Sequence, residues 1–155
     1  MLARPDQRGF SLIEILVVLV IISVFTSLAV VTLESVQSRN NDEEVLRLQR
    51  LLEMAADYSD TRGTPLAVEF LPNGYRFSAM QTNGEWRLIF APSPFSERSW
   101  SEGVRVVRLD LDGVRQNEPL RLVFGSEPPE YRLVLALPEG RKTLSGTISG
   151  MVGLE

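Results

Sequence analysis

The sequence predicts an α+β protein in which a long N-terminal helix, first transmembrane and then amphipathic, packs on an antiparallel β-sandwich. Three observations support this fold class. Residues 10–33 are almost uniformly apolar, residues 34–62 carry apolar side chains at helical spacing, and after Gly63 the apolar residues alternate with a period of two. With 155 residues, the chain is long enough for one modest domain beyond the apolar segment.

The apolar segment at residues 10–33 contains one charged residue, Glu14. About 20 apolar residues in a helix cross a hydrocarbon core of ~30 Å, so the segment is long enough to span a membrane once. Arg4 and Arg8 precede it and Asp42-Glu43-Glu44 follows it, which predicts a cytoplasmic N-terminus and an external C-terminal domain. A plain signal anchor with an incidental glutamate stays open as an alternative. A cleaved secretory signal is disfavoured because Leu28-Ala29-Val30 is a poor cleavage site.

Residues 34–62 are predicted to form an amphipathic helix that lies outside the membrane. Neither proline nor glycine occurs from Glu34 to Ser59, and Gly63 is a candidate C-cap. The stripe predicted to pack on the sheet consists of Val45, Leu48, Leu51, Leu52, Ala55 and Tyr58. The opposite, solvent-facing side consists of Glu43, Arg47, Arg50, Glu53 and Asp57.

Residues 63–155 are predicted to form an antiparallel β domain, either a sandwich or two small sheets. Pro72-Asn73-Gly74 and Asn83-Gly84 supply the turns of an initial three-stranded meander. The predicted strands lie at 66–70, 75–79, 86–90, 104–111, 120–124, 131–137 and 143–152. Residues 91–103 are rich in proline and serine and are predicted to form a loop.

The composition excludes several classes of site. Histidine and cysteine are both absent, which excludes His- and Cys-dependent catalysis, disulfides and His-ligated metals. We therefore expect a chain that is not an enzyme, with no catalytic residue, metal or cofactor. Asp110 and Asp112 supply only half of a calcium loop, so a weak calcium site is the less favoured alternative to a solvated strand end.

The charge distribution along the sequence argues against a nucleic-acid partner. The chain carries a formal net charge of -4; Arg4, Asp6 and Arg8 together contribute +1, so residues after Gly9 carry -5. The one lysine is Lys142, and no basic run is longer than Arg141-Lys142. Phosphate backbones are held by clustered lysine and arginine, which this sequence does not show as a run.

Glu14 is the residue of the apolar segment that requires a partner. An ionised carboxylate inside a bilayer costs about 2.5–3.5 kcal/mol, and less near the interface. No lysine or arginine occurs between Arg8 and Arg39. Cutting the chain after Gly9 would create a new amino group at Phe10, about one helical turn from Glu14. The same amine on a neighbouring chain would serve equally well, so the spacing favours a role of Glu14 in assembly.

The N-terminal residues resemble a known class of processing signal. Gly9-Phe10-Ser11-Leu12-Ile13-Glu14 and the apolar run that follows are similar to the class III signal of type IV pilins and type II secretion pseudopilins. The resemblance implies that a prepilin peptidase cuts between Gly9 and Phe10 and methylates the new N-terminus to N-methylphenylalanine at Phe10. It also implies that Glu14 guides subunit assembly, and that residues 1–9 are a cleaved cytoplasmic leader.

The remaining chain resembles, more loosely, the GspH/FimT branch of pilin-like proteins. The similar parts are residues 47–52, the meander beginning at Pro65, and residues 146–152. The resemblance implies a pilin-like fold and a minor pseudopilin of the GspH family, a structural subunit near the tip of a periplasmic pseudopilus that drives export of folded proteins. Implied partners are the other minor pseudopilins, the major pseudopilin, the prepilin peptidase and inner-membrane lipid, with the secretin or an exported protein as further partners.

A FimT-like minor type IV pilin involved in pilus assembly or DNA uptake is the alternative within the same branch. The tail Gly153-Leu154-Glu155 lacks the basic residues that DNA binding would require, and the paired cysteines common in major pilins are absent. Both departures favour the secretion pseudopilin. The implied location is the bacterial inner membrane, crossed once, with the C-terminal domain in the periplasm.

Overall fold

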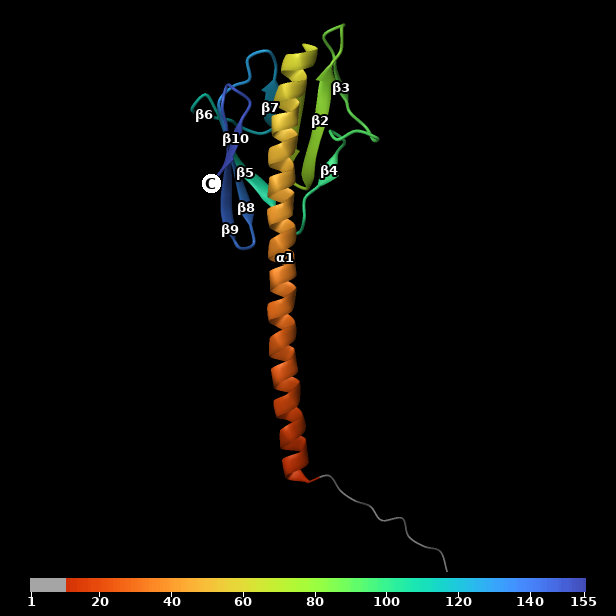
Figure 1. Cartoon of the computed structure of the whole chain (residues 1–155), viewed down its shortest axis with the longest axis vertical. Coiled ribbons are helices and arrows are strands. Elements are labelled where there is room, and N and C mark those ends of the chain that lie inside the picture. Colours follow the sequence, from red (N-terminus) through yellow and green to blue (C-terminus); the bar gives the residue numbers. More distant parts are fainter. Residues whose placement is uncertain (1–10) are drawn as a thin grey trace, which may run out of the picture. The chain divides into compact units, whose positions relative to one another are not determined.

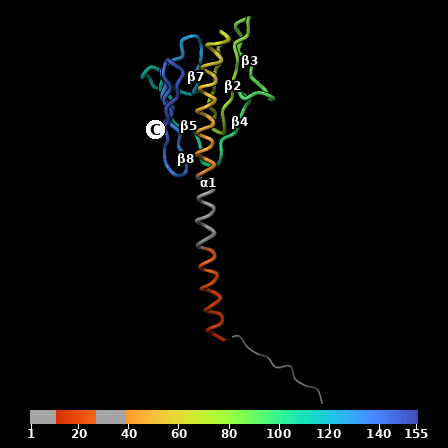
Figure 2. The backbone as a smooth tube through the Cα atoms, viewed as in Figure 1, coloured from red at the N-terminus to blue at the C-terminus, as the bar shows by residue number. Residues whose placement is uncertain are grey.

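The computed structural model describes residues 11–155, apart from the side chains of residues 27–38 (Figure 2). Its contacts divide the chain into two compact units, Met1–Gln37 and Ser38–Glu155. Among the residues that the structure describes, no helix combines the length and apolarity needed to cross a membrane. The predicted span at 10–33 falls partly outside this description, because Phe10 and the side chains of residues 27–33 are not included.

Helix α1 spans Leu12–Arg62, 51 residues, and so includes the whole amphipathic segment predicted to be helical. Gly63 follows with φ of 61°, the left-handed conformation of a glycine C-cap, as the sequence predicted. In the second unit the helix buries one face, formed by Val45, Leu48, Leu51, Leu52, Ala55 and Ala56. The predicted stripe is confirmed except at its end, where Tyr58 remains 38% exposed.

The burial of this face explains why the helix is stable in spite of its mixed composition. Apolar side chains three and four residues apart lie on one side of a helix, so the whole stripe can pack on the sheets at once. Glu43, Arg47, Arg50 and Asp57 are exposed on the other side, as predicted, while Glu53 is half-buried. Glu53 accepts a hydrogen bond from the backbone N–H of Val152 at 3.4 Å, which accounts for its position.

The first sheet contains five antiparallel strands in the order β3-β2-β1-β7, with β4 also pairing with β2. The strands are β1 (Leu66–Leu71), β2 (Gly74–Met80), β3 (Trp86–Leu88), β4 (Arg98–Ser99) and β7 (Leu120–Phe124). The predicted meander is confirmed by the direct pairing of β1 with β2 and of β2 with β3. Gly74 permits the close approach of β4, because a Cβ there would lie 2.1 Å from the carbonyl oxygen of Arg98.

The second sheet contains five antiparallel strands in the order β10-β9-β8-β5-β6. The strands are β5 (Arg105–Leu111), β6 (Val114–Arg115), β8 (Tyr131–Leu137), β9 (Gly140–Gly146) and β10 (Val152–Leu154). Strand β8 alternates cleanly between buried and less buried residues, which places one face of this sheet in the core. An irregularity between Val106 and Arg108 shifts the register of β5 against β8.

The two sheets and the helix share one hydrophobic core. Phe77, Leu122, Leu133 and Leu144 are all fully buried in it, and they come from strands of both sheets. The ring centroids of Phe124 and Tyr131, one from each sheet, lie 6.2 Å apart in an edge-to-face arrangement. Figure 1 shows the strands of the two sheets flanking the part of α1 that belongs to this unit. The predicted α+β fold with an antiparallel β-sandwich is therefore confirmed.

The structure corrects the sequence prediction at three places in the β domain. Residues 147–151 form a turn rather than strand, so the predicted strand 143–152 is two strands, β9 and β10. The predicted loop at 91–103 contains β4, and Phe95 within it is buried. The short strand β6 was not predicted. Two-residue strands depend on a partner strand rather than on their own pattern, which explains both omissions.

Candidate assembly site

The predicted site residues lie at the N-terminus, where the structure describes only part of them. Gly9 and Phe10, the predicted cleavage and methylation residues, lie outside the described residues. Glu14 is described; it stands in the first turn of α1 and is exposed. The proximity of a Phe10 amine to Glu14 therefore stays a prediction.

The start of α1 follows from the local sequence around Glu14. Ser11 precedes the first helical residue, and its carbonyl accepts hydrogen bonds from the backbone N–H groups of Glu14 at 3.0 Å and Ile15 at 3.3 Å. Serine at the N-cap and glutamate three residues later have the spacing of a capping box. A carboxylate in the first turn also interacts favourably with the helix dipole. Glu14 thus suits a helix start as well as an assembly contact.

The helix that follows Glu14 presents apolar side chains on every side. All described side chains from Ser11 to Thr26 are exposed, including Leu12 at 89% and Phe25 at 69%. The hydroxyls of Ser23 and Thr26 donate hydrogen bonds back to the carbonyls of Leu19 and Ile22, four residues earlier. An apolar surface of this extent is typical of lipid contact or of packing against other helices.

A second set of polar contacts fixes the helix to the β domain, and the sequence analysis did not foresee it. Glu44 is buried at 7% exposure, and both its carboxylate oxygens accept the backbone N–H of Ser101, at 3.0 and 3.2 Å. Asn41 is fully buried and donates to a carboxylate oxygen of Glu139 at 3.0 Å. These residues occupy positions beside the apolar stripe, so helical periodicity alone could have marked them as facing the sheets.

The end of the chain is also bound to the helix through side chains. Gln49 donates from its amide nitrogen to the carbonyl of Val152 at 2.7 Å, and Glu53 accepts the N–H of the same residue. Lys142 of the neighbouring strand β9 forms an ion pair with Asp42 of α1. Helix side chains therefore bond both backbone groups of Val152, in a strand that pairs with β9 alone within its sheet.

Two buried tyrosines carry the perturbed acidities of the β domain. Burial raises the pKa of Tyr75 to about 12, with the positive charge of Arg98 opposing the effect and the negative charge of Glu44 adding to it. Burial also raises the pKa of Tyr131, and the negative charge of Glu53 adds to that effect. The hydroxyl of Tyr131 has no hydrogen-bond partner within the described part of the chain. Both groups stay protonated at neutral pH, so neither can serve as a base there.

The aspartates considered for calcium have partners from the protein. Asp110 is buried at 6% exposure and accepts hydrogen bonds from Arg108 Nε at 2.8 and 2.9 Å. Asp112 accepts the backbone N–H of Glu130 at 3.0 Å. The expected solvated strand end is therefore wrong for Asp110, whose carboxylate is covered. Among the described residues, no group of three or more acidic, histidine or cysteine side chains could hold a metal ion.

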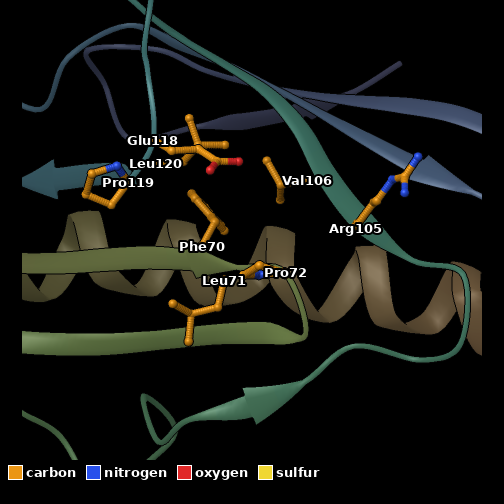
Figure 3. A pocket seen from close by; sticks show the side chains of 8 residues that line it. All are labelled: Phe70, Leu71, Pro72, Arg105, Val106, Glu118, Pro119 and Leu120. Carbon is orange, nitrogen blue, oxygen red and sulfur yellow. The ribbon is translucent and has the colours of Figure 1, made fainter.

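A hollow of about 620 Å³ opens between β1, β5 and β7. It is lined by Phe70, Leu71, Pro72, Arg105, Val106, Glu118, Pro119 and Leu120. In Figure 3 the side chain of Arg105 points away from Phe70 and Leu120, which leaves Glu118 among apolar groups. These lining residues include no nucleophile paired with a base, so their chemistry does not indicate an active site.

The fold is similar to that of solved minor pseudopilins. Two structures of EpsH from the type 2 secretion system of Vibrio cholerae match with TM-scores of 0.57 and 0.61, each at 14% sequence identity. The matches cover 74% and 77% of this chain and 95% and 94% of those chains. At this level of identity the likeness concerns the fold.

Comparisons of the sequence extend the likeness beyond the fold. Residues 4–30 match the prokaryotic N-terminal methylation motif. The chain is 26% identical over 153 residues to type II secretion system protein H of Escherichia coli (strain K12), covering 94% of this chain and 90% of that protein. Over nearly its whole length the chain is therefore similar to an H-type component of a type II secretion system. The corresponding protein of Klebsiella michiganensis is 28% identical over 76 residues, 49% of this chain and 42% of that protein.

These similarities, in the N-terminal motif, in the sequence and in the fold, bear out the resemblance seen in the sequence. The matched motif at 4–30 spans Gly9, Phe10 and Glu14, although the match does not by itself assign a role to any of the three. The FimT-like alternative is not favoured, because the curated relatives are named as secretion-system components.

Proposed function

We propose that this chain is a minor pseudopilin of the GspH type, a structural, non-enzymatic subunit near the tip of a periplasmic pseudopilus that drives export of folded proteins across the outer membrane. The observation that carries the proposal is the exposed apolar start of α1, with Glu14 as its single charge, inside a matched N-terminal methylation motif. Such a helix needs either lipid or other helices around it. Before assembly, the lipid of the inner membrane would surround the helix. In the filament, the helices of neighbouring subunits would replace that lipid.

In this proposal the chain has four functional parts. Residues 1–9 are the leader, 10–33 the membrane and assembly helix, 34–62 the amphipathic periplasmic helix, and 63–155 the β domain. Prepilin peptidase cuts between Gly9 and Phe10 and methylates Phe10. Before assembly the chain crosses the inner membrane once, with the β domain in the periplasm. The other minor pseudopilins and the major pseudopilin are its partners in the filament.

Glu14 is proposed to neutralise the N-terminal amine of a neighbouring subunit during assembly. A carboxylate surrounded by apolar side chains is costly in lipid unless a cation pairs with it, which selects a correctly placed partner. Replacing Glu14 by glutamine removes the charge while keeping the size and the capping capacity of the side chain. The test is therefore Glu14→Gln in the full chain, with Glu43→Gln, an exposed carboxylate of the same helix, as the matched control.

Glu14→Gln should insert into the membrane and lose its leader normally, yet it should fail to co-purify with the other pseudopilins after cross-linking. Glu43→Gln should behave as the unmodified chain in membrane insertion, in loss of the leader and in co-purification. Normal co-purification and normal secretion with Glu14→Gln would refute the assembly role. Intact mass gives the processing state, and a chain beginning at Phe10 with one added methyl group is the expected mature form.

A further inference from the structure

The outer face of the second sheet gathers most of the arginines of the β domain. Tyr131, Leu133 and Leu135 of β8 point into the core, so the residues between them point outward. Paired residues of neighbouring strands share a face, which extends the assignment across the sheet. The residues that this places outward and exposed are Arg105, Arg108, Arg115, Arg132 and Arg141. We call these five residues the arginine face.

The pairing register places the arginine face in three adjacent rows. Arg115, Asp110, Arg132 and Ser145 form one row across β6, β5, β8 and β9. The next row contains Arg108, Val134, Thr143 and Glu155, the last through paired backbone hydrogen bonds of 2.8 and 2.9 Å with Thr143. The third contains Arg105, Ala136 and Arg141. Strands lie about 4.8 Å apart, so these arginines share one continuous surface.

The charge of this surface is opposite to that of the chain. Five arginines and three carboxylates, Asp110, Glu130 and Glu155, give it +2, whereas the whole chain carries -4. The remaining side chains therefore sum to -6. Glu130 and Glu155 are exposed, whereas Asp110 is covered and paired with Arg108. The arginines come from four strands, so the sequence shows no basic run where the fold builds a basic surface.

The side chains between the arginines are small. Val134, Ala136, Thr143 and Ser145 are half-buried, and Gly153 of β10 pairs with Ser145. A flat strip of small residues bordered by exposed guanidinium groups allows another surface to approach the sheet closely. Arginine presents a planar fork that binds carboxylates through two parallel hydrogen bonds, and it is enriched in protein interfaces. The ion pair between Arg108 and Asp110, at 2.8 Å, holds the guanidinium group of Arg108 in one orientation before a partner binds.

We propose that the arginine face docks a carboxylate-rich surface of a neighbouring pseudopilin subunit. The inference rests on the proposed function, since it takes the partner from the filament. A protein partner suits the charge distribution better than a nucleic acid does. A long polyanion would meet both the +2 face and the -6 remainder of the chain, and the second repels it. A folded domain with a local acidic patch meets only the face.

The test measures binding of the full chain, in detergent, to each of the other full-length pseudopilins of the same secretion system. The variant is Arg132→Glu with Arg141→Glu, and the matched control is Arg50→Glu with Arg87→Glu, two exposed arginines away from the face. Both double variants change the net charge by -4. Binding of one pseudopilin should weaken about tenfold or more in the face variant and less than about twofold in the control. Affinity of the unmodified chain should fall steeply as salt is raised.

The outcomes separate this inference from the proposed function. If the unmodified chain binds a pseudopilin and the face variant binds it equally well, the docking role is wrong while the proposed function stands. If the unmodified chain binds none of them, both are wrong. The milder variant Arg132→Gln with Arg141→Gln should give an intermediate loss, with an unchanged urea unfolding midpoint; an unchanged affinity would count against the proposal. Loss of binding to a DNA duplex or to anionic vesicles instead of to a subunit would overturn it.

Discussion

The two units of the chain use helical residues in opposite ways. From Ser11 to Thr26 every described side chain of α1 is exposed, and its apolar residues have no partner among the described residues. From Asn41 to Ser59 the same helix buries one face completely and bonds to strands and loops with its polar side chains. The apolar side chains of the first segment are therefore left uncovered by the described residues, whereas those of the second are covered within the domain.

This difference predicts that mutations in the second unit lower the stability of the domain and that mutations in the first unit do not. The largest loss is expected for Leu48→Ala, at the centre of the buried stripe with 0% exposure. Truncating a buried leucine costs about 2–5 kcal/mol, because the cavity that it leaves collapses only partly. Urea unfolding followed by the fluorescence of Trp86 and Trp100 measures it. Leu46→Ala, 40% exposed on the same helix, is the control and should change stability by less than about 0.5 kcal/mol.

Gly146→Ala should have the next largest effect. A Cβ at this position would lie 2.0 Å from the ring of Tyr131, which pairs with Gly146 across β8 and β9. The ring is packed against Phe124 and has little room to move, so overpacking of about 1–3 kcal/mol is expected. Gly125→Ala is the control, since a Cβ there meets nothing within 4 Å. Equal unfolding midpoints for the two variants would show that the sheet can shift to accept the methyl group.

Alkaline pH should destabilise the β domain through its buried tyrosines. Their pKa values are raised in the folded state, to about 12 for Tyr75, so the unfolded chain releases its protons first as pH rises above about 10. Stability is fully present below pH ~10 and falls by on the order of 1.4 kcal/mol per pH unit for each tyrosine until its folded-state pKa is passed.

Tyr131→Phe should reduce this loss and leave stability at pH 7 unchanged or slightly higher, because it removes a buried hydroxyl without a partner. Urea midpoints at pH 7, 10 and 11 give the comparison. An identical fall in both proteins would show that Tyr131 ionises normally in the folded state.

Glu44→Gln should weaken the link between the helix and the loop that contains Ser101. The neutral amide keeps one acceptor for the Ser101 N–H but loses the charge-assisted bonds at 3.0 and 3.2 Å, at a cost of about 1 kcal/mol. Glu43→Gln, exposed and one residue earlier, should cost less than half as much. Faster amide hydrogen exchange at Ser101 in the first variant alone would locate the effect.

The smallest effect on the domain should come from the first unit. Leu16→Ala removes a side chain that is 62% exposed, so the free energy of unfolding of the β domain should change by less than about 0.5 kcal/mol. A large shift would show that residues near the start of α1 stabilise the domain, and the contrast between the two units would be wrong.

The features that the sequence predicted well are those with a strong local period. The stripe from Val45 to Ala55 repeats at helical spacing, and the Asn83-Gly84 turn is a direct hairpin signal, with φ of 82° at Gly84. Tyr58 was predicted to lie in the buried stripe, but it is partly exposed because it follows the stripe at the rim of the domain. There the centroid of its ring lies 5.9 Å from that of Phe95 in the loop. The position of that loop is a tertiary property that the helical pattern does not contain.

The features that the sequence did not predict depend on pairing between distant segments. Asp110 was expected to be solvated, yet it is buried at a position where β5 pairs with both β6 and β8. The arginine face was missed because Arg105 and Arg141 become neighbours only through the register of β8 with both flanking strands. Of the candidate assembly site, a motif match covers residues 4–30, and the roles of Gly9, Phe10 and Glu14 within it stay predictions.

The polar contacts of α1 also determine how the domain would bear a mechanical load. Glu44, Gln49, Glu53 and the hydroxyl of Ser59 bond to the loop at Ser101, to Val152 at the end of the chain and to Leu66 at the start of β1. A force along this part of the helix would therefore stretch attachments to both sheets at the same moment. We expect the domain to unfold cooperatively under such a force, and not to release one strand after another.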